Sequence, residues 1–249
     1  MADEPEVAFY ARGGSPFGDW LTLLHPPYTA WHLAYVAIGA ALAPRIDWAV
    51  LWLTVAGFFL AVGVAAHALD EWNGRPLHTR ISDGALWTAA IVSLAGAVAL
   101  GVRVLGHSGL GLIPFIVLGV LFVLGYNLEL FDGVLHTDLG FAVTWGAFPV
   151  AVGYVAQGPA WTASGTIGLL AAAVAATALS AAQRRLSTPA RALRRDVIGI
   201  GGSIELVGGN SFDIDRDLLL APLDGALKLL SSAAPAFAAA LLLARWAGR

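Results

Sequence analysis

The stretch that decides the fold runs from residue 48 to residue 75 and reads WAVLWLTVAGFFLAVGVAAHALDEWNGR. Its first nineteen residues carry no charge, whereas His67, Asp70, Glu71 and Arg75 crowd its end. A helix needs about 20 apolar residues to cross the hydrocarbon core of a bilayer. The stretch therefore predicts a membrane span that ends in a polar cluster at one membrane face.

The composition agrees with a membrane protein. Apolar residues make up 58% of the 249 residues and charged residues 12%, which is about half the charged share of a soluble domain. This composition excludes a soluble enzyme. With 14 basic and 17 acidic residues, the chain also lacks the basic character of a nucleic-acid-binding protein, so no nucleic-acid partner is expected.

Seven apolar runs follow one another along the chain, and an eighth, partial one is conceivable within 197–221. They cover residues 28–44, 48–69, 84–105, 109–131, 137–157, 161–183 and 223–246. We therefore expect an all-α membrane protein, a bundle of about seven or eight transmembrane helices. Residues 1–27 form an N-terminal segment, and residues 28–249 form one transmembrane domain with a long loop at 184–222.

The arginines indicate the orientation of a seven-span bundle. Nine of them fall on the side of the N-terminus and four on the other side. Because cytoplasmic connections carry the excess of Lys and Arg, the sequence predicts a multi-pass protein whose N-terminus and 184–222 loop are cytoplasmic. Three polar clusters fall on this same side. Ionisable groups within spans are costly unless they face water or the bundle interior, so we expect a polar cavity at the cytoplasmic face.

The first cluster closes the second run. His67, Asp70 and Glu71 stand at i, i+3 and i+4, so they share one face of a helix. Carboxylates suit Mg²⁺, while added imidazole suits Zn²⁺ or Fe. Asp70 is the strongest candidate because the Gly74-Arg75-Pro76 turn follows it. A helix end whose carboxylates pair with nearby arginines is the alternative, above all for Glu71.

The second cluster follows the fourth run, and the third closes the sixth. The second contains Tyr126, Asn127, Glu129, His136 and Asp138. Its side chains could add metal ligands or contact a substrate. The third contains Gln183, Arg184 and Arg185, followed by Arg191, Arg194 and Arg195. Guanidinium groups can bind phosphate in a bidentate manner, but the same residues could contact lipid headgroups as a positive-inside signal.

Residues Leu21 to about Leu86 resemble the start of the UbiA superfamily of intramembrane prenyltransferases. His25-Pro26-Pro27 resembles the Pro-containing segment that leads into the family's first span. The stretch 67–73 stands at the place of the Asn/Asp-rich motif, and Arg75-Pro76-Leu77 at that of the turn after it. The run Tyr126 to Gln157, with Gly146, Pro149, Gly153 and Tyr154, is similar to the family's middle spans.

The chain also departs from the family pattern. His67 stands where Asn is usual, and the sixth span ends in Ser180-Ala-Ala-Gln183-Arg184-Arg185 without the second acidic motif. Family members usually have nine spans, whereas we count seven. The resemblance therefore supports the architecture more strongly than the reaction.

The resemblance implies prenyl transfer from an isoprenoid diphosphate. In that reaction Mg²⁺ held by carboxylates binds the diphosphate, arginines neutralise the departing charge, and an acceptor captures the allylic cation. Asp70, Glu71 and Glu129 are then the catalytic candidates. The candidate metal ligands are His67, Asp70, Glu71, Glu129, His136 and Asp138. The candidate substrate contacts are Asn73, Arg75, Tyr126, Asn127, Gln183, Arg184 and Arg185.

Two other functions fit the residues. The imidazoles and carboxylates could bind Zn²⁺ or Fe in an enzyme that hydrolyses or oxidises a membrane lipid. The chain could also be a transporter or an assembly subunit without catalytic activity. A transporter usually places its polar groups near the bilayer midplane, whereas here they gather at one face, which argues against transport.

Overall fold

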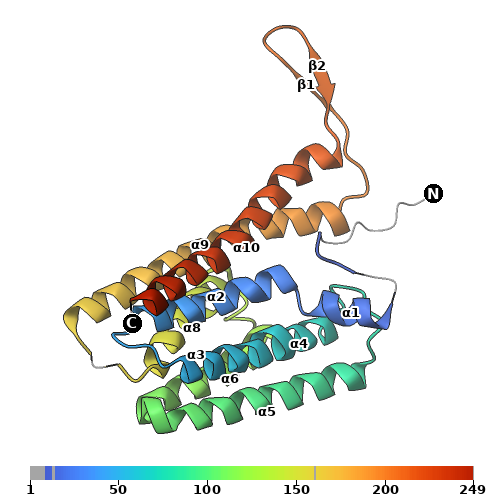
Figure 1. Cartoon of the computed structure of the whole chain (residues 1–249). Coiled ribbons are helices and arrows are strands. Elements are labelled where there is room, and N and C mark those ends of the chain that lie inside the picture. The colour runs from blue at the N-terminus through green and yellow to red at the C-terminus, as the bar shows by residue number, and fades with distance from the viewer. Residues whose placement is uncertain (1–8, 13–14, 160, 249) are drawn as a thin grey trace.

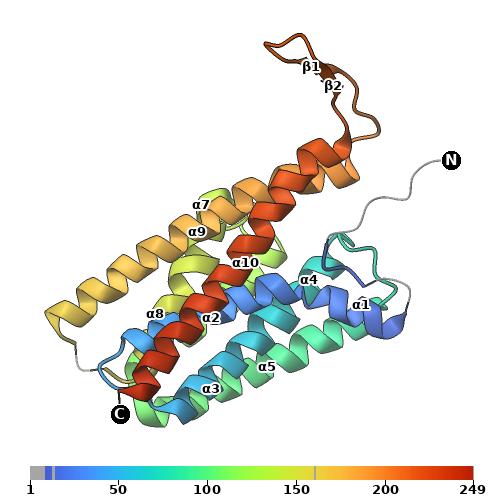
Figure 2. The same ribbon diagram turned by 45° about the horizontal axis from the view of Figure 1, so that its top comes forward.

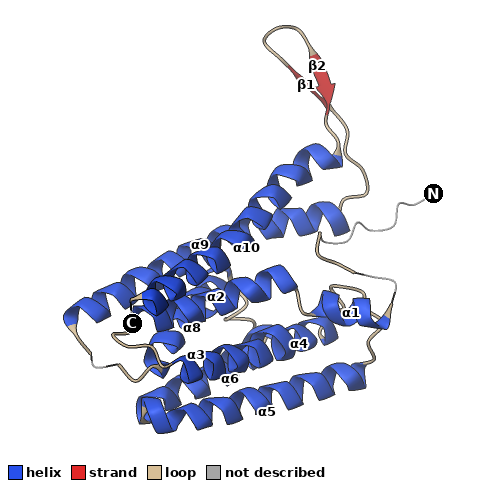
Figure 3. Ribbon diagram, in the orientation of Figure 1, coloured by secondary structure: helices blue, strands red, loops and turns tan. Residues whose placement is uncertain are grey.

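The protein is described by a computed structural model that covers residues 9–12, 15–159 and 161–248. This part of the chain is mostly helical, and one short β-hairpin projects from the end of two long helices (Figures 1 and 3). Six helical segments are long and apolar enough to cross a membrane, which agrees with a multi-pass membrane protein. They are Trp48–Trp72, Asp83–Ser108, Leu110–Asn127, Asp138–Ala156, Ala163–Arg195 and Arg216–Ala247.

Several of these segments are built from consecutive helical pieces. The second expected span consists of α3 (Trp48–Phe58), the π-helical η1 (Phe59–Ala66) and α4 (His67–Trp72). The third is α5 (Asp83–Ser108), and the fourth joins the short 3-10 turn η2 (Leu110–Leu112) to α6 (Ile113–Asn127). The fifth contains α7 (Asp138–Ala142), the π-helical η3 (Val143–Ala147) and α8 (Phe148–Ala156). The remaining helices are α1 (Pro16–Leu23), α2 (Pro26–Leu42), α9 (Ala163–Arg195) and α10 (Arg216–Ala247).

Polar residues set the start of the apolar helices. The Asp47 carboxylate accepts hydrogen bonds from the backbone N–H groups of Ala49 and Val50 at the start of α3. Ser82, Thr137 and Thr162 cap α5, α7 and α9 in the same way. These side chains satisfy backbone N–H groups that have no partner within the helix. Each cap therefore ends a connection and begins a span.

α2 lies at the centre of the bundle between α8 and α10 (Figure 2). Glycines allow α2 and α8 to approach at backbone distance. A Cβ atom on Gly39 would lie 2.0 Å from the carbonyl oxygen of Val150, and one on Gly153 would lie 2.0 Å from that of Val36. Small residues at such crossings provide the close packing on which helix association in a membrane depends. This contact fixes the helices that surround the site.

The predicted loop at 184–222 is too long, which is a correction. α9 continues to Arg195 and α10 begins at Arg216. The antiparallel strands β1 (Ser203–Glu205) and β2 (Ser211–Asp213) lie between them. Hydropathy detects the part of a helix that can cross a membrane. A polar sequence rich in Arg, Ala and Leu can still continue the helix, because these residues have high helix propensity. A 33-residue α9 is about 50 Å long, so it exceeds the hydrocarbon core of about 30 Å.

The predicted fourth span, 109–131, is shorter than expected. α6 ends at Asn127, and Glu129, Phe131, Asp132 and Gly133 all have positive φ angles. Left-handed backbone cannot continue an α-helix. Glu129 and Asp132 therefore lie in a turn and not on one helical face.

Candidate functional site

A cavity of about 710 Å³ opens at the end of the bundle that carries α1, where the three polar clusters meet. Its walls come from α1, α2, η1, α4, α6, α7, η3, α9 and α10, from residues 9–11 and from the turns after α4 and α6. Seven of the thirteen sequence-predicted site residues line this cavity. Those that line it are His67, Asp70, Tyr126, Asn127, His136, Gln183 and Arg184.

Asp70 contributes an unpartnered carboxylate to this cavity. It lies on α4, one turn after His67, whose Nδ1 donates to the carbonyl oxygen of Gly63 at 3.1 Å. Within the described part of the chain, the Asp70 carboxylate forms no hydrogen bond and no ion pair. It interacts electrostatically with Arg191, Arg195 and His136. Asp70 is therefore free to bind a cation or a proton from a ligand.

Glu71 has a different role from Asp70. Its side chain is fully buried and accepts hydrogen bonds from the backbone N–H of Leu77 at 2.9 Å. It also accepts from the backbone N–H and the hydroxyl of Thr79, both at 2.8 Å. These bonds hold the turn that follows α4. Glu71 thus stabilises one wall of the cavity and does not face its interior.

Asn73 and Arg75 also belong to this turn. The Asn73 side chain donates to the carbonyl oxygen of Asn127 at 3.1 Å. Arg75 has a φ of +50°, donates to the carbonyl oxygen of Ile81 at 2.5 Å and pairs with Asp83. Both side chains are engaged in contacts within the protein, and these contacts position the connection between α4 and α5.

The second cluster divides in the same way. The Tyr126 and His136 rings stack with centroids 4.6 Å apart and face the cavity. The Glu129 side chain is 58% exposed and lies 3.6 Å from Nδ1 of His136. Asp138 accepts from Nε of Arg184 at 2.6 Å. Glu129 and Asp138 therefore lie at the rim of the cavity: each contacts a residue that lines it but does not line it itself.

α9 contributes a polar face to the cavity. Arg184 donates to the Tyr126 hydroxyl at 2.8 Å, in addition to its pair with Asp138, and Gln183 is buried with its Oε1 atom unpartnered. Arg185 is exposed but does not line the cavity. Further along the same face, Ser187, Ala190, Arg191, Arg194 and Arg195 reach the cavity. The sequence signal for these residues is their helical spacing from Gln183 and Arg184.

A stacked histidine pair lies beside Asp70, and one of its members, His25, was not among the predicted site residues. The rings of His25 and His67 stack with centroids 4.3 Å apart, and Tyr10 lies 3.2 Å from Nδ1 of His25. Burial and the neighbouring His67 hold the pKa of His25 well below its usual value, so His25 is neutral at pH 7. Burial raises the pKa of Tyr10, with Tyr28 as the next cause. The cavity therefore contains neutral hydrogen-bonding groups beside Asp70.

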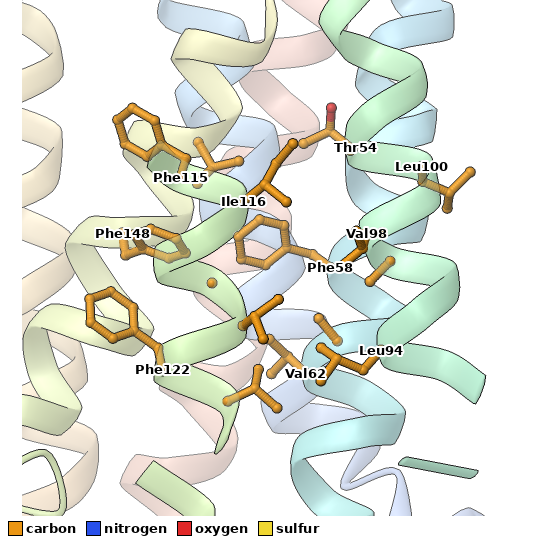
Figure 4. Close-up of a pocket in the computed structure, with 18 of the residues that line it drawn as sticks. Thr54, Phe58, Val62, Leu94, Val98, Leu100, Phe115, Ile116, Phe122 and Phe148 are labelled. Carbon is orange, nitrogen blue, oxygen red and sulfur yellow. The ribbon is translucent and has the colours of Figure 1, made fainter. Parts of the chain in front are cut away.

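A second, apolar cavity lies deeper in the bundle (Figure 4). The α3–η1 segment, α5, α6 and α8 surround it, and phenylalanines from three of these elements point into it: Phe58, Phe115, Phe122 and Phe148. The hydroxyl of Thr54 donates to the carbonyl oxygen of Val50, so this wall presents no free polar group there. Val62 and Trp145 line both cavities. The apolar cavity thus adjoins the charged one.

Both π-helical stretches lie at this junction. Val62 belongs to η1 and Trp145 to η3. Nδ1 of the buried His32 donates to the backbone carbonyl oxygen of Trp145 at 2.9 Å. π-Helical turns widen a helix locally and occur frequently at functional sites.

The sequence-predicted metal ligands do not come together as one group. Among residues 9–12, 15–159 and 161–248, no three His, Asp or Glu side chains form a candidate metal centre. His67, Asp70 and His136 line the cavity, whereas Glu71 holds the turn after α4 and Glu129 and Asp138 lie at the rim.

Compared with known proteins, the chain matches no family model, no curated protein and no solved structure.

Proposed function

We propose that the chain is a UbiA-like membrane enzyme that transfers a prenyl group from an isoprenoid diphosphate or a related lipid. The observation that carries the proposal is the shared wall of the two cavities, Val62 and Trp145. A molecule with a hydrocarbon chain and a charged end is divided into an apolar and a charged part, as the two adjoining cavities are. Its chain matches the apolar cavity, and its charged end matches the cavity that contains Asp70 and the arginines.

The proposal includes seven spans, with α2 added to the six apolar segments. α2 has 17 residues, and most of its side chains are buried among α8 and α10. A seventh span places the N-terminus and the β-hairpin on one side of the membrane. The excess of arginine on that side supports a cytoplasmic position for both and for the charged cavity.

The residues fit Mg²⁺ that arrives with the diphosphate. Mg²⁺ is commonly held by one or two carboxylates, with phosphate oxygens and water as its other ligands. Asp70 supplies one unpartnered carboxylate of this kind. When bound, the ion supplies positive charge that stabilises the departing diphosphate. A resident Zn²⁺ or Fe centre has less support, because such sites use three or more protein ligands.

The chain's own residues divide the remaining work. The basic face of α9 supplies fixed positive charge, which stabilises an anion more strongly when water is excluded. Trp145 lies where the cavities meet, and the Tyr126 ring lines the charged cavity with its centroid 5.6 Å from that of Trp145. An aromatic face can stabilise a nearby cation such as the allylic cation.

A chain-length experiment tests the proposal. Purified protein in nanodiscs receives Mg²⁺, a mixture of lipid-quinone and phenolic acceptors, and prenyl diphosphates of increasing length, and released pyrophosphate is measured. Gly119 borders the apolar cavity near Phe148, so Gly119→Phe should abolish turnover of the longer donors and retain the shorter ones. Gly168→Phe adds the same ring at an open position on α9 and should behave as wild type. Absence of pyrophosphate release from every donor by the wild-type protein would contradict the proposed function.

A further inference from the structure

The α9 face of the charged cavity contains two kinds of arginine. Arg184 and Arg194 are paired with carboxylates, Arg184 with Asp138 and Arg194 with Asp224. Arg191 and Arg195 form no ion pair with any carboxylate in the described part of the chain. Within the described part of the chain, Arg191 forms one hydrogen bond, which it donates to the Thr188 hydroxyl on its own helix at 3.5 Å. The fold therefore leaves two guanidinium groups available.

The charge balance of the cavity favours an anion. Arg80 and Asp19 both line it and pair with each other at 3.3 Å between Nε and Oδ2. After the paired groups are set aside, the lining residues leave Arg191 and Arg195 opposite the single carboxylate of Asp70. Two cations and one anion thus remain among the lining residues, and the excess is positive.

The position of these groups is set by helical spacing. Arg191 follows Arg184 by seven residues, and Arg195 follows Arg191 by four, so all three occupy one side of α9. Arg191 also acts electrostatically on Tyr10 and His25 and on Tyr28 and Asp70. Arg191 and Arg195 are exposed, and they line the cavity together with side chains from the N-terminal segment, α2 and α4.

We infer that Arg191 and Arg195 form a binding site for a phosphate-type anion, such as a diphosphate or a phosphate headgroup, opposite Asp70. Guanidinium forks match phosphate oxygens in geometry as well as in charge. The identification of the anion as the end of a prenyl substrate rests on the proposed function, whereas the site itself rests on the unpaired arginines. The inference also explains a departure from the family pattern, since basic residues replace the second acidic motif at this end of the span.

The test compares the double variant Arg191→Gln/Arg195→Gln with the control Arg185→Gln. Arg185 lies on the same helix and is exposed but does not line the cavity, so its loss changes the charge of this region without changing the site. The protein is purified in a neutral detergent, and its thermal stabilisation is measured against inorganic pyrophosphate in one arm. In the other arm it is measured against phosphatidylglycerol added to the micelles.

We expect the double variant to bind one or both anions at least about tenfold more weakly than wild type, because it loses two groups that form charge-assisted hydrogen bonds to phosphate oxygens. Arg185→Gln should bind as wild type. Arg191→Lys/Arg195→Lys should recover part of the loss, because Lys keeps the charge but not the fork. This partial rescue separates anion binding from a defect in folding.

The two arms distinguish the source of the anion. Arginine-dependent binding of pyrophosphate identifies a free diphosphate end, whereas dependence in the phosphatidylglycerol arm alone identifies a lipid headgroup. Either result supports the site, and the second does so while the proposed transfer reaction fails. The inference is overturned if wild type binds neither anion, if the double variant binds as wild type, or if Arg185→Gln shows the same loss.

Discussion

Replacement of Glu71 should destabilise the protein, although the residue adjoins Asp70 in the sequence. Glu71 is fully buried, and its carboxylate accepts three hydrogen bonds from Leu77 and Thr79. Glu71→Ala removes both acceptor oxygens, and with them all three hydrogen bonds. The backbone N–H groups of the half-buried Leu77 and the buried Thr79 would then be left without partners.

The magnitude follows from these three bonds. A hydrogen bond to a charged group contributes about 1.5–3 kcal/mol, and an unsatisfied buried donor costs about 1–3 kcal/mol. Because bonds within one network are not additive, we expect a loss of about 3–5 kcal/mol in the free energy of unfolding. For a chain of this size such a loss lowers the melting temperature by on the order of 10 °C.

The assay is thermal unfolding in detergent, followed by circular dichroism. Glu71→Gln keeps the shape and one acceptor oxygen, so its loss should be intermediate. Glu129→Gln is the matched control, because Glu129 is 58% exposed and such a pair contributes about 0–1 kcal/mol. If Glu71→Ala melts within the range of Glu129→Gln, the turn does not depend on Glu71 and the residue regains its place as a candidate ligand.

Two other predictions concern the helix contacts that hold the site. Gly153→Ala should cost about 1–3 kcal/mol, because its Cβ would lie 2.0 Å from the Val36 carbonyl oxygen; Gly168→Ala, at an open position, should melt as wild type, and equal melting of both variants would contradict the α2–α8 contact. Arg194→Met should cost about 2–4 kcal/mol, because it leaves the carboxylate of Asp224, which is only 17% exposed, without its partner. Arg194→Met/Asp224→Leu should recover most of this loss, and additive losses in this double-mutant cycle would show that the pair does not couple α9 to α10.

The positions of the apolar helices could be predicted from the sequence, because each needs a long uncharged run bounded by polar caps. Asp47 and Ser82 stand directly before such runs and cap α3 and α5. The ends at the charged face were less predictable. α9 continues through twelve residues beyond 183 because helix propensity does not require apolar side chains.

The candidate site could be predicted in part. His67, Asp70 and Arg184 reach the cavity as their clusters suggest. Glu71 does not, because residues at i+3 and i+4 flank a helical face on opposite sides, and the turn after α4 needs an acceptor on one of them. The role of His25 depends on its contact with His67 across the bundle, and no local pattern contains that information.

Pyrophosphate binding by wild type and Asp70→Asn, with and without Mg²⁺, tests the central claim most directly. Asp70→Asn keeps the shape of the side chain, and the Asp70 carboxylate forms no hydrogen bond or ion pair within the described part of the chain. The variant should therefore melt as wild type. If the charged cavity holds a diphosphate with Mg²⁺ at Asp70, the ion should strengthen pyrophosphate binding in wild type at least about tenfold and leave the variant unchanged. An equal effect of Mg²⁺ on both proteins would contradict the assignment of this cavity to a diphosphate-handling enzyme.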